Sequence, residues 1–554
     1  MKSCLRAHND TFHRPSAWLL LAVLGLPLLT SLWGAVMAGA NFAAWQALIN
    51  NAQTLPALGM SLWTGLLATA LAVAGAAYVL SSDVGQRTGA RLMRLLAPML
   101  AMPHAAFAIG LVFLIAPSGW LLRALSPWAT GFNAPPPWLT TQDPWGLGLI
   151  LVLVAKEIPF LLWTAATQLQ RPDVAQVWTR ELQVARSMGY SARTAWWRVL
   201  WPQLWPRLHW PMLAVLTYNL TVVEMALVIG PTSPPTLAVL AWQWLLDADI
   251  AMNAQGAAAA WLLAGVLAGV ASGVWPMTRH RGWRTRWITG HRGAAHAPHR
   301  QYSSTRNGLF SVLMGLYLAV MAALALGSVS GLWPFPQLLP QTFTGQAWVS
   351  VAGSLTTLQT TLTLASASAL TALLWSVAWL EWAPPALVHR LRPVLYLPLV
   401  LPPVLWVVGV HAMTLTVGLD ATWTGLWLAH TLATVPYVLI TLTPAYTGFD
   451  PRLWHISASL GQGRGVFLWR VKWPLLRASL AASFAIGFAV SVAQYLPTLF
   501  IGAGRFASIT TEAVTLASGA QRSLTSAYAW LQWLLPVLVF GLAAWLGQPR
   551  RPIK

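Results

Sequence analysis

The amino-acid sequence predicts an all-α polytopic membrane protein, with about 12 transmembrane helices arranged as two parallel six-helix repeats. Its 554 residues are 57% hydrophobic and only 8% charged. Apolar runs of about 18–25 residues recur along the chain, long enough to cross a hydrocarbon core of roughly 30 Å as helices. One polar motif also occurs twice, 272 residues apart, between such runs.

Twelve apolar runs are long enough to span a membrane. We expect these spans at 17–37, 58–80, 95–116, 146–166, 210–230, 257–275, 308–328, 352–380, 393–416, 424–444, 478–500 and 527–546. Pro402 and Pro403 weaken the ninth, because proline lacks an N–H and bends a helix. The first run exceeds the 7–15 apolar residues of a secretory signal, so we expect an uncleaved helix even though Ala-Gly-Ala at 38–40 imitates a cleavage site.

The net charge of +20 indicates membrane orientation. If both termini lie in the cytoplasm, 29 of the 33 Lys and Arg residues fall in cytoplasmic segments. Arg123, Arg505 and Arg522 fall outside, and Lys156 falls within a span. Cytoplasmic loops of membrane proteins carry such an excess, which also attracts anionic lipid. We therefore expect contact with membrane lipids and no binding of nucleic acid.

The duplication divides the chain into a first lobe at 1–277, a basic cytoplasmic linker at 278–306 and a second lobe at 307–554. Six spans per lobe is an even number, so both lobes enter the membrane from the same side and the repeat is parallel. The linker histidines at 291, 296 and 299 lack acidic neighbours, and Cys4 is the sole cysteine. We therefore expect no metal site and no disulfide within the chain.

The duplicated motif reads SMGYSARTAWWRVLWP at 187–202 and SLGQGRGVFLWRVKWP at 459–474, identical at seven of sixteen places. Each copy follows apolar residues at helical spacing, and a glycine then offers the left-handed conformation that ends a helix. We expect a cytoplasmic helix, a sharp turn at Gly189 or Gly461 and a second short helix. Such an element suits docking to a partner, or alternatively rests on lipid headgroups. Two copies with thirteen residues from glycine to proline favour docking.

These segments resemble the EAA loop of ATP-binding cassette (ABC) importer permeases, and the resemblance extends to two fused six-span units like those of the ferric-iron and thiamine importers. The matching residues are Gly189, Trp197, Arg198 and Pro202 in loop 171–206, and Gly461, Trp469, Arg470 and Pro474 in loop 448–477. In that family the loop forms a coupling helix held in a cleft of the ATPase. The resemblance implies two ABC ATPase subunits, an extracytoplasmic solute-binding protein and a bacterial inner membrane.

The chain departs from the family where a glutamate precedes the glycine by six residues. Gln183 and His455 occupy those places, and Glu181 lies two residues too early. A phosphate-binding P-loop needs Gly-Lys-Ser/Thr, but none of the four lysines follows a glycine. We therefore expect no cofactor on this chain, no catalytic residue and no enzymatic activity, with ATP and Mg²⁺ bound by the partner subunit.

Ionisable and polar side chains inside spans are costly, so each needs a reason. Lys156 and Glu157 are adjacent and form a candidate intramembrane pair, either as a structural tie or as part of the path. Glu224, Gln494 and Asn219 are candidates for the translocation path, since the resemblance places the fifth helix of each lobe there. A buried structural hydrogen bond is the alternative for Glu224.

Two other functions fit parts of the pattern. An ion-coupled transporter of the major facilitator type also has twelve spans in two parallel halves, and the loop SDVGQRTGARLMRL at 82–95 resembles its signature, but with the wrong Asp–Arg spacing. A membrane enzyme would need a convergent set of His, Asp or Glu, which the sequence lacks. The substrate stays open among ferric iron, thiamine, a polyamine, a phosphonate or another solute.

Overall fold

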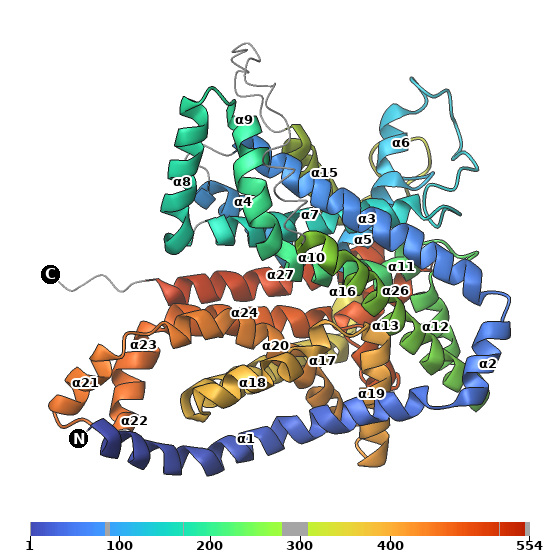
Figure 1. Ribbon diagram of the computed structural model, residues 1–554. Coiled ribbons are helices and arrows are strands. Elements are labelled where there is room, and N and C mark those ends of the chain that lie inside the picture. The colour runs from blue at the N-terminus through green and yellow to red at the C-terminus, as the bar shows by residue number, and fades with distance from the viewer. Residues whose placement is uncertain (1, 84–88, 170, 280–307, 520, 549–554) are drawn as a thin grey trace. The chain divides into compact units, whose positions relative to one another are not determined.

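The computed structural model describes residues 2–83, 89–169, 171–279, 308–519 and 521–548 (Figure 1). These residues fold almost wholly into helices, and their one β-bridge pairs Ser330 with Phe343. This confirms the predicted all-α class. Nearly all of the expected linker, including its histidines at 291, 296 and 299, lies outside the described residues.

The chain divides into two compact units. Unit 1 comprises residues 1–40 and 346–554, and unit 2 comprises residues 41–345. The helices of unit 1 are α1 (Lys2–Gly39), α16 (Gln346–Gly353), α17 (Leu355–Trp382), α18 (Pro385–Leu395), α19 (Pro403–Thr416), α20 (Trp423–Thr447), α21 (Arg452–Ser459), α22 (Arg464–Phe467), α23 (Trp473–Leu475), α24 (Arg477–Ala493), α25 (Leu496–Gly502), α26 (Ile509–Ala517) and α27 (Arg522–Gly547), with the short turns η2 (Leu397–Leu399) and η3 (Leu468–Lys472).

Unit 2 repeats much of this order. Its helices are α2 (Phe42–Asn50), α3 (Thr54–Asp83), α4 (Gly89–Ala101), α5 (His104–Ile115), α6 (Trp120–Leu125), α7 (Leu147–Leu169), α8 (Pro172–Ser187), α9 (Ala192–Ala195), α10 (Trp201–Thr221), α11 (Glu224–Ile229), α12 (Leu237–Leu245), α13 (Ile250–Arg279) and α15 (Gly308–Ser328), with the turn η1 (Trp196–Leu200).

Within the described ranges, nine helical segments are long and apolar enough to cross a membrane, or up to eleven if two bent pairs count as one span each. The nine are α1, α3, α5 with α6, α7, α13, α15, α17, α20 and α27. The bent pairs are the segment from α18 to α19 and the segment from α22 to α24, with bends of 104° and 74°. Pro402 and Pro403 lie at the first of these bends.

The fifth expected span, 210–230, is not among these segments. Helix α10 ends at Thr221, Val222 takes an extended conformation, and α11 begins at Glu224. The sequence there is apolar on both sides of the break, so composition alone shows a continuous run. The helix ends because the backbone of Val222 leaves the helical region, with ψ of 136°, which hydropathy does not detect.

The first helix of each sequence half packs in the unit formed mainly by the other half. In unit 1, α1 packs on α19, where a Cβ on Gly409 would overlap the carbonyl oxygen of Ser31. In unit 2, α15 packs on α5, where a Cβ on Gly110 would lie 2.6 Å from Cγ1 of Val320. The compact units therefore exchange segments relative to the sequence halves, and the repeat boundaries themselves stay a prediction.

Each unit has a core of interlocked long helices. In unit 1, α17, α20 and α24 contact one another, and Gly487 lies so close to Thr434 and Ala369 that a Cβ there would meet both within 3.2 Å. In unit 2, α3 packs against α7 and α10, and α10 also contacts α13. Small residues at such interfaces let helix backbones approach closely, as membrane helices require.

Candidate functional site

The two motif copies fold into matching surface elbows. We call residues 171–206 the first elbow and residues 448–477 the second elbow. In the first, α8 leads into α9 and η1, and in the second, α21 leads into α22 and η3 (Figure 1). Each copy therefore forms the predicted helix, turn and second helix.

The glycine turn is identical in the two elbows. Gly189 and Gly461 adopt φ angles of +86° and +75°. After α8, the N–H of Tyr190 donates to the carbonyl of Ala185 at 3.1 Å, and that of Gly189 donates to Arg186 at 3.0 Å. After α21, Gln462 donates to Ser457 at 3.1 Å, and Gly461 donates to Ala458 at 3.0 Å. This pair of bonds defines the Schellman helix ending, which favours glycine because other residues resist positive φ.

A wide helical turn follows in the same register in both copies. Residues 196–200 and 468–472 form π-helical turns, with Trp201 N–H donating to Trp196 and Trp473 N–H to Leu468. Pro202 and Pro474 come next; each lacks an N–H, and its ring would press on the carbonyl four residues earlier, that of Arg198 or Arg470. A π turn widens the helix just before the proline in both copies. The place of the proline after the turn is therefore shared by the two backbones.

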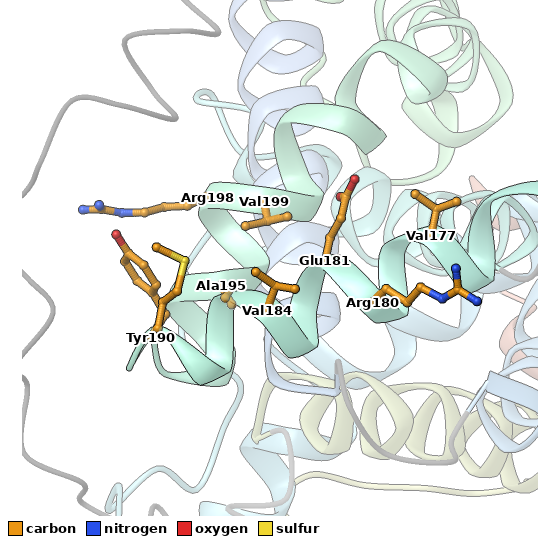
Figure 2. A pocket seen from close by; sticks show the side chains of 10 residues that line it. Val177, Arg180, Glu181, Val184, Tyr190, Ala195, Arg198 and Val199 are labelled. Carbon is orange, nitrogen blue, oxygen red and sulfur yellow. The ribbon is translucent and has the colours of Figure 1, made fainter.

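The first elbow buries one face and exposes another. Val174, Trp178 and Ala185 of α8 are buried, whereas Val177, Val184 and Met188 are exposed. A groove of about 520 Å³ lies along the exposed face (Figure 2). It is lined by Val177, Arg180, Glu181, Val184, Ala185, Met188, Tyr190, Ala195, Arg198 and Val199. An apolar groove edged by arginines suits a protein partner.

The second elbow exposes a comparable apolar surface. Ile456, Leu460 and Trp469 lie in solvent, while Phe467 and Leu468 are buried beneath them. The ring of Trp454 meets that of Phe467 at 5.3 Å between centroids. The two elbows thus share an exposed apolar stripe but differ in the residues that form it.

The predicted coupling residues occupy unequal surroundings. Trp197 is half-buried against Trp196, with centroids 4.9 Å apart, whereas its counterpart Trp469 is 72% exposed. Arg198 lies 5.9 Å from the ring centroid of Tyr190, and Arg470 is exposed. Pro202 is buried, and Pro474 is exposed.

Neither elbow presents a carboxylate at the place of the family glutamate, where Gln183 and His455 are both exposed. Glu181 points elsewhere. It accepts a hydrogen bond from Nε2 of Gln203 at 2.7 Å, and Oε1 of Gln203 accepts one from Nε1 of Trp178 at 3.0 Å. Glu181 therefore braces α8 against α10 and does not replace the missing glutamate.

The adjacent residues Lys156 and Glu157 have separate partners in unit 2. Both are buried. Nζ of Lys156 donates to the carbonyls of Met99 at 3.2 Å and Met102 at 2.6 Å. Those carbonyls lie at the end of α4, where backbone C=O groups have no hydrogen-bond donor within the helix. Oε1 of Glu157 lies 3.7 Å from Nε2 of His104. Lys156 thus holds the break between α4 and α5, which supports the structural alternative for this pair.

The three path candidates sit at or beside helix breaks. Oε1 of Glu224 accepts a hydrogen bond from the hydroxyl of Tyr218 at 2.8 Å, and the Tyr218 ring lies 4.5 Å from that of His104. Asn219 is buried and donates to Oγ1 of Thr69 at 3.0 Å. Gln494 is the extended residue that ends α24.

The fifth helix of each half breaks at the same place. Val222 and Gln494 are 272 residues apart, the elbow spacing, and both are extended, with ψ of 136° and 114°. Glu224 therefore corresponds to Leu496, not to Gln494. Non-helical backbone at membrane depth is tolerated only inside protein or along a cavity. Among the described residues, no group of three or more His, Cys, Asp or Glu could hold a metal ion.

Glu381 was missed by the sequence reasoning. It lies at the end of α17, just beyond the predicted span 352–380, and it binds Arg464 and Lys472 of the second elbow. A lone carboxylate beside a basic loop was the available signal, but the count of charges covered only Lys and Arg.

Paired helical units, twin surface elbows and breaks inside the spans define a membrane transport permease. No family model matches the chain. It is 33% identical over 545 residues to the inner membrane ABC transporter permease protein YnjC of Escherichia coli, covering 97% of this chain and 98% of that protein. The chain belongs to the ABC transporter permeases.

Shorter similarities agree with that family. The molybdenum transport system permease protein ModB of Mycobacterium bovis is 30% identical over 131 residues, covering 22% of this chain and 50% of that protein. The spermidine/putrescine transport system permease protein PotC of Haemophilus influenzae is 24% identical over 107 residues, or 19% and 42%. These relatives are permeases, not enzymes, and they give no support to the major facilitator alternative. The chain is a multi-pass inner-membrane transport protein.

Proposed function

We propose that this chain forms the whole transmembrane part of an ABC importer. Its two lobes surround the path of a small solute, its elbows dock two ATPase subunits, and a separate extracytoplasmic protein delivers the cargo. The observation that carries the proposal is the pair of elbows, which share a Schellman glycine, a π turn and an exposed apolar stripe at one spacing of 272 residues. An element that only rested on lipid headgroups would not need two copies with the same turns and the same spacing.

The proposed mechanism is a shift between two membrane states. ATP and Mg²⁺ bind to the partner subunits, whose closure moves the elbows and rocks the lobes. ATP can drive this change only if its affinity differs between the two states. Both chain termini and both elbows then lie in the cytoplasm, as the distribution of Lys and Arg indicates.

The cargo is proposed only as a small solute. Relatives named for molybdenum and for spermidine/putrescine match this chain over similar lengths. An oxyanion and a polyamine therefore both stay open, as do ferric iron, thiamine and a phosphonate.

The double substitution Gly189→Pro with Gly461→Pro tests the docking role. Proline fixes φ near −65°, so neither glycine turn, at +86° and +75°, can form. We expect at least a tenfold loss of ATPase subunit co-purifying with the tagged chain, about 1.4 kcal/mol of binding, with normal membrane insertion. Gly463→Pro is the matched control, because Gly463 has φ of −73° and nothing within 4 Å of an added Cβ. Undiminished co-purification of the double variant would refute the docking assignment.

A further inference from the structure

The Glu381 side chain joins the second elbow to the core of unit 1. Its side chain is 7% exposed, and its carboxylate accepts hydrogen bonds from three residues. Nη2 of Arg464 lies 2.8 Å from Oε1, Nζ of Lys472 lies 2.6 Å from Oε2, and the hydroxyl of Tyr446 donates to Oε2 at 2.7 Å. Nη2 of Arg464 also donates to the backbone carbonyl of Glu381 at 3.1 Å. Charge-assisted bonds to a shielded carboxylate are among the stronger polar contacts.

The two cations bracket the second helix of the elbow. Arg464 is the first residue of α22, and Lys472 is the last residue of η3. Lys472 also lies over the Tyr446 ring, 4.0 Å from its centroid, and Nε1 of Trp473 donates to the Tyr446 hydroxyl at 3.4 Å. Because both ends of the segment are bound to one carboxylate, it cannot turn or slide without displacing Glu381.

Glu381 is in turn fixed to the helices that form the unit 1 core. It lies in the last turn of α17, which packs against both α20 and α24. Tyr446 comes from the end of α20, so the carboxylate joins two core helices and the elbow. A displacement of the elbow is therefore passed to α17 through an ionic contact as well as through apolar packing.

The first elbow has described contacts of its own. Glu181 lies within α8 and accepts a hydrogen bond from Gln203 of α10. One described contact with α3, the second long helix of the first half as α17 is of the second, places the guanidinium of Arg193 5.3 Å from the ring centroid of Tyr78. Arg193 lies one residue beyond the place equivalent to Arg464. Arg193 and Arg464 thus each bring a cation of their elbow to a long helix of their own unit, α3 in unit 2 and α17 in unit 1.

We propose that Glu381 is a positioning residue for energy coupling, which passes ATP-driven movement of the second elbow to α17. This rests on the proposed function, since it assumes that an ATPase moves the elbow. It assigns Glu381 a role beyond local stability.

Electron paramagnetic resonance distances between spin labels test this without knowledge of the cargo. In a Cys4→Ser background, labels go on Leu55→Cys and Leu355→Cys, which are exposed at the starts of α3 and α17. The native complex is compared without nucleotide and after trapping with Mg-ATP and vanadate. We expect a nucleotide-dependent shift of the distance distribution in the parent. In Glu381→Gln this shift falls to less than half, while ATPase subunit binding and basal ATP hydrolysis persist.

Glu512→Gln is the matched control, because it removes a partly buried carboxylate of α26 in unit 1, outside both elbows, and should keep the shift. A full shift in Glu381→Gln would overturn the proposal. If that variant fails to accumulate, Glu381→Asp and Lys472→Met decide: a reduced shift in both supports the proposal, and full shifts in both overturn it. A parent complex with no ATPase subunit or no shift would instead refute the proposed function, and this inference with it.

Discussion

A tryptophan occupies the same place in both elbows, yet its surroundings differ. Trp197 packs against Trp196 and Trp201, at 4.9 and 5.6 Å between centroids. Trp469 meets Trp473 at 4.7 Å but leaves most of its indole in solvent. A large exposed aromatic side chain beside an apolar stripe is typical of a binding hot spot. We therefore propose that Trp197 serves the fold of its elbow and that Trp469 binds the partner.

This difference predicts that replacing the tryptophan by alanine weakens partner binding in the second elbow and lowers stability in the first. Trp469→Ala should weaken ATPase subunit binding roughly thirtyfold, about 2 kcal/mol, and leave the thermal stability of the chain unchanged. Trp197→Ala should lower thermal stability, because it removes a packed aromatic side chain. Titration of ATPase subunit onto detergent-purified chain, beside thermal unfolding of the chain alone, measures both. Equal loss of affinity in both variants, without loss of stability, would contradict the distinction.

At the scale of the element, the break between α4 and α5 depends on one buried amine. Lys156 reaches the carbonyls of Met99 and Met102, whereas Glu157 faces His104. If Lys156 and Glu157 paired with each other, replacing either residue would remove the same ion pair and destabilise the fold to the same extent. The contacts instead predict that they act separately.

Lys156→Met and Glu157→Gln separate these alternatives. Lys156→Met leaves buried carbonyls without their donor, which costs about 1–3 kcal/mol, so its unfolding midpoint should fall clearly. Glu157→Gln keeps a polar side chain of the same size beside His104 and should change the midpoint little. Thermal unfolding of each variant in detergent gives the comparison. Equal destabilisation would favour the mutual pair.

Sequence patterns predicted the elements that depend on local rules. The turns at Gly189 and Gly461 followed from apolar periodicity ending at glycine, and the structure has both with positive φ. The π turns were not predicted, because they depend on how a proline ring is accommodated four residues after an arginine. The breaks at Val222 and Gln494 were also missed, since the surrounding residues stay apolar.

At the scale of the whole molecule, the repeat predicted equivalent halves but not their exchange. In a duplicated chain, the first helix of each half can pack against its own half or against the other half. The choice depends on close contacts such as Gly110 with Val320 and Gly409 with Ser31, which pair residues far apart in sequence. Glu381 escaped notice for the same reason, since Arg464 and Lys472 lie 83 and 91 residues away.

Native mass spectrometry of the tagged chain, released gently from its own membranes, tests the central claim most directly. We expect one chain with two ATPase subunits, hydrolysing ATP. Complexes of the Gly189→Pro, Gly461→Pro double variant should lose both subunits. A stable single chain that carries no ATPase subunit in several mild detergents would contradict the account and leave the elbows as lipid-facing anchors.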